Sequence, residues 1–222
     1  MNKYPKPRRH FSEKQLLEAW SKSRDSRASA KSPGVDGITP QDFRSNLNHN
    51  LAHLSRQLCA GAFRFSPLRP IAIEKKSGNY RIIFIPTVQD RLVQRRICEW
   101  LSSGDVLGVE NRVSYGFRSG LGVGKAVKKA RDIRRTHPFV MKSDISSFFD
   151  EIDRSILINK IEKKLGKNSL IPFIRSSIEC EIDIKDEFIK IAIATTNINS
   201  RQGSKAGNAH LANSVKFRAQ RF

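Results

Sequence analysis

The sequence predicts an α+β fold, because helix and strand patterns interleave along the chain without the regular alternation of a doubly wound sheet. Two runs rich in β-branched residues, 69–73 and 81–85, flank a linker with turn chemistry at 75–79, and together they predict a β-hairpin. Apolar residues at helical spacing predict helices before and after it. Hydrophobic residues make up 38% of the 222 residues, which is enough to bury a core.

Two helices are expected before the hairpin. Ser12 and Gln15 have capping-box spacing at the start of the first helix. Thr39 as N-cap and Pro40 at the first helical position open the second. Apolar residues repeat at helical spacing along this second helix until Gly61 ends it.

The chain after the hairpin predicts three further helices, a short strand and a second hairpin. The helices are expected at 88–100, 123–135 and 156–161, where apolar residues follow the helical period. Residues 139–143 form a short β-rich run, and we expect a strand there. Residues 177–195 alternate or run apolar, so they predict a second hairpin that turns near its middle.

Charge gives the first indication of function. The chain has 41 Lys and Arg against 21 Asp and Glu, a net charge of +20. Such an excess predicts an anionic partner, most commonly nucleic acid, because each cation that meets a phosphate releases a counterion. A solvated basic surface or a ribosome-associated protein is the alternative.

In the helix at 123–135, Val123, Val127 and Ala130 are expected to point inward, opposite a basic outer face.

Other features of the composition argue against several classes of protein. The three cysteines lie far apart and show no C-x-x-C spacing, which argues against a disulfide framework and a zinc ribbon. This pattern fits a reduced, cytoplasmic environment. The basic N-terminus is not followed by the apolar region of a signal peptide, and no stretch approaches the ~20 apolar residues of a membrane helix. We therefore expect no contact with a membrane.

Five segments carry the most informative motifs. In chain order they are 32–39 (SPGVDGIT), 67–91 (ending RIIFIPTVQDR), 114–120 (SYGFRSG), 143–152 (SDISSFFDEI) and 202–213 (beginning QGS and ending LAN). This set resembles bacterial reverse transcriptases, the RNA-directed DNA polymerases of the group II intron, retron and antiviral-defence lineage. The first is similar to the PGVDG block and the second to the fingers segment. The third is similar to SYGFRPG, and the last two to motifs A and B.

The resemblance implies a right-hand polymerase: fingers plus a partial palm, with an antiparallel sheet and flanking helices. It divides the chain into a basic N-terminal helix and linker at 1–31, fingers at 32–110, and a partial palm at 111–222. The family's motif C, written YxDD, supplies a second pair of carboxylates and does not occur in this sequence. We therefore expect a missing C-terminal region or a second chain to complete the palm.

Asp144 is the candidate catalytic residue. It follows the strand expected at 139–143, and a carboxylate at a strand end is held rigidly, as a metal ligand requires. From position alone, a surface carboxylate that caps the next turn is the simpler interpretation. The resemblance implies that Asp144 binds both Mg²⁺ ions of nucleotidyl transfer and that the Ile145 carbonyl helps to bind one. It also implies that Phe149 is the steric gate that excludes a 2′-hydroxyl, although its residue type alone favours a core aromatic.

The resemblance further implies contacts with substrate. Lys75 and Arg81 lie on the hairpin expected to fold over the incoming nucleotide, where an Arg fork and a Lys point charge suit a triphosphate. Their alternative is an ordinary solvated face. Arg118 would lie near the nucleotide and the template strand, and Gln202 and Gly203 near the templating base.

We therefore expect a reverse transcriptase domain, a nucleotidyltransferase that binds RNA and DNA. Its partners would be an RNA template, a DNA or RNA primer and dNTPs. Without motif C this chain is expected to be inactive by itself, and a non-catalytic RNA-binding module derived from a truncated reverse transcriptase stays open. A nuclease or integrase would need further carboxylates beside Asp144; Asp150 and Asp153 are near in sequence but are expected to point elsewhere. Motif B here lacks both family prolines, which favours a defence-type or otherwise divergent branch.

Overall fold

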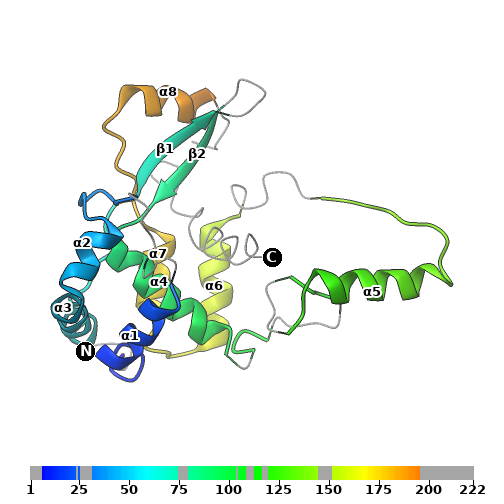
Figure 1. Ribbon diagram of the computed structural model, residues 1–222, viewed down its shortest axis with the longest axis horizontal. Coiled ribbons are helices and arrows are strands. Elements are labelled where there is room, and N and C mark those ends of the chain that lie inside the picture. Colours follow the sequence, from blue (N-terminus) through cyan, green and yellow to red (C-terminus); the bar gives the residue numbers. More distant parts are fainter. Residues whose placement is uncertain are drawn as a thin grey trace.

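The computed structural model describes residues 7–23, 25, 32–74, 80–103, 105–108, 113–116, 120–144 and 152–195. Its elements are α1 (Glu13–Ser21), α2 (Pro40–Ser45), α3 (Leu47–Ala60), β1 (Arg69–Glu74), β2 (Tyr80–Ile85), α4 (Val88–Leu101), α5 (Val123–Arg134), α6 (Arg154–Leu165), α7 (Ile171–Ile178) and α8 (Glu187–Thr195). A helical body carries the β1–β2 hairpin and α8 on one side, while α5 lies on an arm that extends from another (Figure 1). This mixture of helices with an antiparallel hairpin confirms the α+β class.

The helix starts expected from capping signals are confirmed. The Ser12 backbone N–H donates to Oε1 of Gln15 at 3.1 Å, and the Ser12 hydroxyl accepts from the Gln15 N–H, which completes the capping box of α1. Thr39 and Asp42 form the same reciprocal pair at α2. The second expected helix is divided at Asn46 into α2 and α3. Gly61 ends α3 with a φ of +73°, a conformation that favours glycine.

The first hairpin is confirmed. β1 and β2 pair antiparallel, with Ile71 opposite Ile83 and Glu74 opposite Tyr80. Alternation along β2 buries Ile82 and Phe84, while Arg81 is exposed on the other face. The hairpin therefore has one face packed on the molecule and one face open to solvent.

The prediction of a second hairpin at 177–195 is wrong. α7 ends at Ile178, and α8 covers the second half of the range as a helix. Between them, Ile182 forms a parallel bridge with Leu68, so the strand-like residues pair beside the first hairpin. On α8, Ile189 is buried. Ile193, four residues later, is partly buried and packs against the apolar cluster at the hairpin. Strand propensity depends strongly on context, and here packing on an existing hairpin favours a helix.

The prediction of a short strand at 139–143 is also wrong. Residues 138–144 run back from α5 as an extended chain (Figure 1) but belong to no strand. Phe139, Val140 and Met141 are 94%, 75% and 88% exposed. A strand needs a neighbouring strand to satisfy its backbone groups, and none of the described strands pairs with this segment. β-rich composition alone therefore did not decide the conformation.

The prediction of a helix at α5 is confirmed, but the prediction that its apolar side chains point inward is wrong. Val123 and Val127 are 70% and 60% exposed, Ala130 is exposed, and α5 has no buried residue. The arm holds α5 away from the helical body, so its apolar side meets no described element (Figure 1). Apolar periodicity identifies the helix face that can be buried, but it does not show which element, if any, packs on that face.

One large apolar core joins the helices of the body. Its buried side chains come from α1, α2, α3, α4, α6 and α7 and from the segments beside them, and include Phe11, Leu16, Phe43, Leu54, Leu58, Val93, Ile97, Ile158, Phe173 and Ile174. α7, which the sequence reading did not anticipate, contributes through its apolar run IPFIRSSI. This core contains residues from each of the three ranges expected to be separate regions. No described helix is both long and apolar enough to cross a bilayer.

Candidate active site and nucleic-acid surface

The first two sequence motifs pack against each other. A Cβ atom built on Gly34 would lie 2.6 Å from both the backbone N and the Cα of Thr87, so only glycine fits this contact. Thr87 is the N-cap of α4, and its hydroxyl accepts the Asp90 backbone N–H at 3.2 Å. The loop at 32–37 is thereby docked on the start of α4, directly after the hairpin.

Arg91 ties this loop and the N-terminal segment to α4. One of its terminal nitrogens donates to the Ser32 carbonyl at 3.2 Å, and its Nε lies 3.0 Å from a carboxylate oxygen of Asp25. Burial raises the pKa of Asp25, and the neighbouring Arg91 and Arg95 oppose that rise without cancelling it. The guanidinium therefore connects two segments that lie far before it in the sequence.

A second group of polar side chains is buried at the base of the hairpin, and sequence reasoning missed it. Asp90 and Gln94, four residues apart on α4, are each almost fully buried. Nε2 of Gln94 donates to the Ser177 hydroxyl of α7 at 3.2 Å. Polar residues at core-facing positions of an amphipathic helix were the available signal, because such groups stay buried only when they are hydrogen-bonded.

Of the candidate substrate residues, Arg81 is described. It lies on β2 opposite Ile73, on the exposed face of the hairpin. Its guanidinium can therefore meet a ligand without prior removal from the protein interior. Lys75, Arg118, Gln202 and Gly203 lie outside the described residues.

Asp144 is the last described residue of the segment that returns from the α5 arm, and its side chain is exposed. Ile145 and Phe149 lie outside the described residues. Asp153 has a structural role, since its carboxylate accepts the Ile156 N–H at 2.8 Å and caps α6. Within the described part of the chain, no three His, Cys, Asp or Glu side chains form a group able to hold a metal ion. These residues therefore supply Asp144 as a single exposed carboxylate, which can serve as one Mg²⁺ ligand but not as a complete site.

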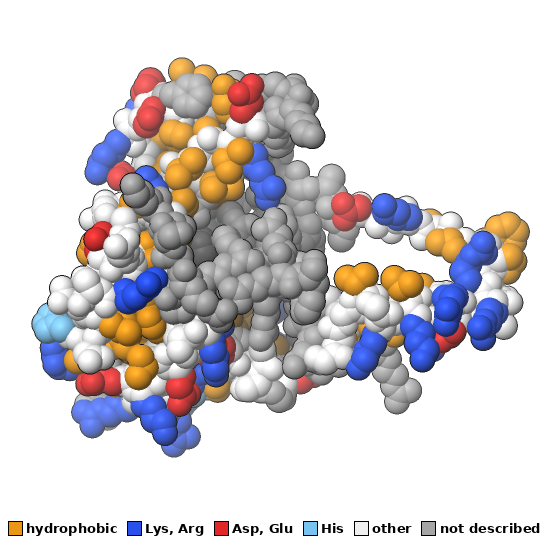
Figure 2. All heavy atoms as spheres, in the orientation of Figure 1, with side chains coloured by type: hydrophobic (Ala, Val, Ile, Leu, Met, Phe, Trp, Pro, Cys, Tyr) orange, Lys and Arg blue, Asp and Glu red, His pale blue; other side chains and the backbone are white. Residues whose placement is uncertain are grey.

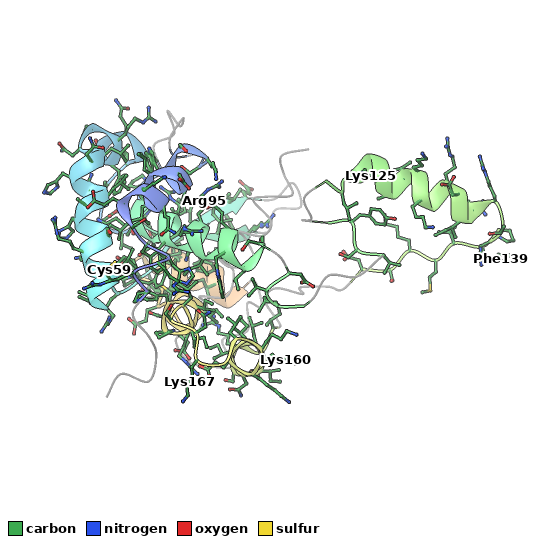
Figure 3. All side chains as sticks on the ribbon, turned by 90° about the horizontal axis from the view of Figure 1, so that it is seen from below. Cys59, Arg95, Lys125, Phe139, Lys160 and Lys167 are labelled. Carbon is green, nitrogen blue, oxygen red and sulfur yellow. The ribbon has the colours of Figure 1, made fainter. Side chains whose placement is uncertain are left out.

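Basic side chains cover two helices. On α5 and its C-terminal end they are Lys125, Lys128, Lys129, Arg131, Arg134 and Arg135, all exposed. Figure 2 shows Lys and Arg along one edge of this arm and hydrophobic side chains along the edge facing the returning chain. A second set lies on and just after α6: Lys160, Lys163 and Lys164 are on the helix and Lys167 follows it, all of them exposed. Figure 3 shows Lys160 and Lys167 at the edge of the body. No acidic side chain in the described ranges forms an ion pair with Lys125, Lys160 or Lys167.

Residues 73–207 match the sequence model described as "Reverse transcriptase (RNA-dependent DNA polymerase)". This chain belongs to the reverse transcriptase family. The match begins in β1 and includes Arg81, α4 and Asp144, so the resemblance carried by the motifs is confirmed.

Several known proteins are similar to this reverse transcriptase-family chain. "Protein YkfC" of Escherichia coli is 28% identical over 166 residues, covering 70% of this chain and 42% of YkfC. The "Putative COX1/OXI3 intron 2 protein" of Saccharomyces cerevisiae is 27% identical over 153 residues, covering 68% of this chain and 17% of that protein. A chain of the solved "Partial Cas6-RT-Cas1--Cas2 complex" is 22% identical with a TM-score of 0.45, covering 76% of this chain and 28% of that one. The intron-encoded relative agrees with the expected lineage, and this chain spans less than half the length of either curated relative.

Proposed function

We propose that this chain provides the fingers and the first palm segments of an RNA-directed DNA polymerase. The observation that carries the proposal is the family match over 73–207, a range that includes the exposed carboxylate of Asp144 and the exposed guanidinium of Arg81. In the complete enzyme, DNA would be made on an RNA template by extension of a DNA or RNA primer with dNTPs. Fingers at 32–110 and a partial palm at 111–222 are the division that we propose, with 1–31 as the N-terminal helix and linker.

We assign roles by position in the motifs. Asp144, with the carbonyl of Ile145, would hold Mg²⁺, which when bound neutralises charge on the reacting phosphates. Lys75 and Arg81 would bind the triphosphate from the hairpin, and Phe149 would lie under the sugar. The packing of the 32–37 loop on Thr87 supports this scheme, because it brings the first motif against the start of α4, directly after the hairpin that carries Arg81.

Arg118 would lie beside the nucleotide and template, and Gln202 with Gly203 beside the templating base. The 222-residue sequence contains no YxDD, so we propose that this polypeptide alone does not polymerise and needs further palm residues from a C-terminal region or a second chain. A cytoplasmic location remains a prediction from the cysteine pattern.

The test is primer extension on an RNA template with dNTPs and Mg²⁺. The 222-residue chain should give no product, and a chain extended through YxDD should give product that Asp144→Ala abolishes. Glu18→Ala is the matched control, because Glu18 is an exposed acid on α1 outside the family match. Near-normal synthesis by the extended Asp144→Ala chain would refute the assignment of Asp144.

A non-catalytic RNA-binding module is the second candidate. The exposed basic side chains of α5 and α6 favour it, because exposed cations suit a phosphate backbone irrespective of any chemistry. The two candidate functions are distinguished by comparing RNA binding by the 222-residue chain with DNA synthesis by the extended chain. RNA binding by the 222-residue chain, together with no synthesis by the extended chain, would favour the module over the polymerase.

A further inference from the structure

We propose that Asp90 is a pH-sensitive positioning residue that closes the base of the β1–β2 hairpin and so sets where the hairpin lies on the helical body. The contacts that carry this inference involve the hairpin junction, which we define as Ser66, Leu68, Asp90 and Cys180. Because Arg81 lies on the same hairpin, a change in the hairpin's position would also move the proposed triphosphate ligand. Only that effect on nucleotide binding rests on the proposed function.

Asp90 joins the two ends of the hairpin. It lies in the first turn of α4, which begins three residues after β2 ends, and it is 1% exposed. One of its carboxylate oxygens accepts the backbone N–H of Ser66 at 3.2 Å. Ser66 lies three residues before β1, so this hydrogen bond links the chain entering the hairpin to the helix that leaves it.

The same short segment is held from its other side. The Ser66 carbonyl accepts the thiol of Cys180 at 2.9 Å, in the connector that follows α7. Leu68 is fully buried and pairs through its backbone, donating to the Glu181 carbonyl at 2.8 Å and accepting from the Asp183 N–H at 2.9 Å. Residues 66–68 are therefore clamped between α4 and the connector, and the hairpin starts immediately after this clamp.

The charge state of Asp90 affects this clamp. Burial raises the pKa of the Asp90 carboxyl to about 7, Asp36 on the 32–37 loop adds to the rise, and hydrogen bonds from Thr87 and Ser66 oppose it. On the connector side, burial raises the pKa of the Cys180 thiol to about 12, so the thiol is neutral near pH 7. Asp90 and then Glu181 raise the pKa of Cys180 further, and Arg154 from α6 lowers it.

The direction of the pH effect follows from linkage. The carboxyl titrates near its ordinary value of 3.8 when the junction is open, and near 7 when it is closed. The closed junction therefore binds the proton more tightly, and its stabilisation is complete at low pH and is lost as the pH rises toward 7. Between pH ~5 and ~7 the equilibrium constant for opening should rise about tenfold per pH unit, and it should level off above the folded pKa.

Cys180 provides the probe, because its buried thiol can react only when the junction opens. We would replace Cys59 and Cys98 by serine, leaving Cys180 as the single thiol of the chain. The rate of its reaction with an aromatic disulfide reagent is measured across this pH range. Division by the rate in denaturant at the same pH removes the intrinsic ionisation of the thiol.

The normalised rate should rise about tenfold per pH unit and then level off near pH 7. Asp90→Asn, which keeps an acceptor oxygen but cannot ionise, should make the rate independent of pH. Asp36→Asn should shift the midpoint to lower pH, and Asp132→Asn, on exposed α5, should leave the profile unchanged.

A parent profile that is flat below pH 7, or an Asp90→Asn profile that follows the parent, would overturn the proposal. Amide exchange at Leu68 in the parent, normalised in the same way, tests it without any change at Asp90; pH-independent protection there would also overturn it. No nucleic acid, nucleotide or metal is present in these measurements. Their failure is therefore distinct from failure of the proposed polymerase function.

Discussion

Replacement of Gly34 by alanine should weaken the docking of the 32–37 loop on α4. The added methyl carbon would lie 2.6 Å from the N and Cα of Thr87 and 2.9 Å from its Cγ2, whereas carbon atoms in contact normally lie ~3.5–4.0 Å apart. Thr87 cannot move aside cheaply, because it is buried and caps α4. The loop must therefore shift by about 1 Å.

The cost can be bounded. Forcing an extra methyl group into a packed contact costs ~1–3 kcal/mol, and loss of the hydrogen bond from Arg91 to the Ser32 carbonyl adds about 1 kcal/mol. Alanine restricts the unfolded chain more than glycine, which offsets ~0.4–1 kcal/mol. The net free energy of unfolding should fall by about 1–4 kcal/mol, which for a domain of this size lowers Tm by roughly 2–16 °C.

Urea unfolding followed by far-UV circular dichroism measures this change. The matched control is Gly124→Ala on α5, where a built Cβ meets no atom within 4 Å. That helix position should gain up to ~1 kcal/mol from alanine. If the two variants were equally stable, or Gly34→Ala matched the parent, the loop would not be docked on Thr87 as described.

Three further predictions concern binding, selectivity and capping. RNA affinity of the 222-residue chain should fall on the order of 10³-fold between ~50 and ~200 mM salt if six or more phosphates are contacted, and a flat salt titration would remove the electrostatic account. In a chain extended through YxDD, Phe149→Ala should admit ribonucleotides; unchanged discrimination between dNTP and NTP in primer extension would make Phe149 a packing residue. Asp153→Ala should lower stability by ~1 kcal/mol in urea unfolding through loss of the α6 cap, and no change would show that the cap is replaced by water.

Local chemistry was enough to predict several elements. The capping boxes at Ser12 and Thr39 form because both partners lie within one helical turn, so no distant contact is needed. The pairing of β1 with β2 also follows from local sequence, because two β-rich runs flank residues with turn chemistry. Of the candidate site, the exposed position of Arg81 on β2 follows from strand alternation in the same way.

Elements decided by distant partners could not be predicted. Residues 139–143 and the segment that forms α8 have similar β-rich compositions, yet one is an exposed extended segment and the other a helix beside the hairpin. The bridge between Leu68 and Ile182 joins residues more than a hundred positions apart, and no local pattern signals it. For Asp90, its place in the first turn of α4 was visible, but its burial depends on Ser66 and the connector after α7.

The N-terminal segment explains how the family-matched region is stabilised. The match starts at residue 73, yet α4 packs on α1, which lies before it and in turn packs on α3. The Ser55 hydroxyl of α3 donates to the Phe11 carbonyl at 2.7 Å, and Nε of Arg96 on α4 donates to the His10 carbonyl at 3.1 Å. Phe11 itself is fully buried against Phe173 of α7, with ring centroids 5.3 Å apart. Because α4 also anchors both ends of the hairpin, residues 7–60 act on the hairpin's position through the packing of this one helix.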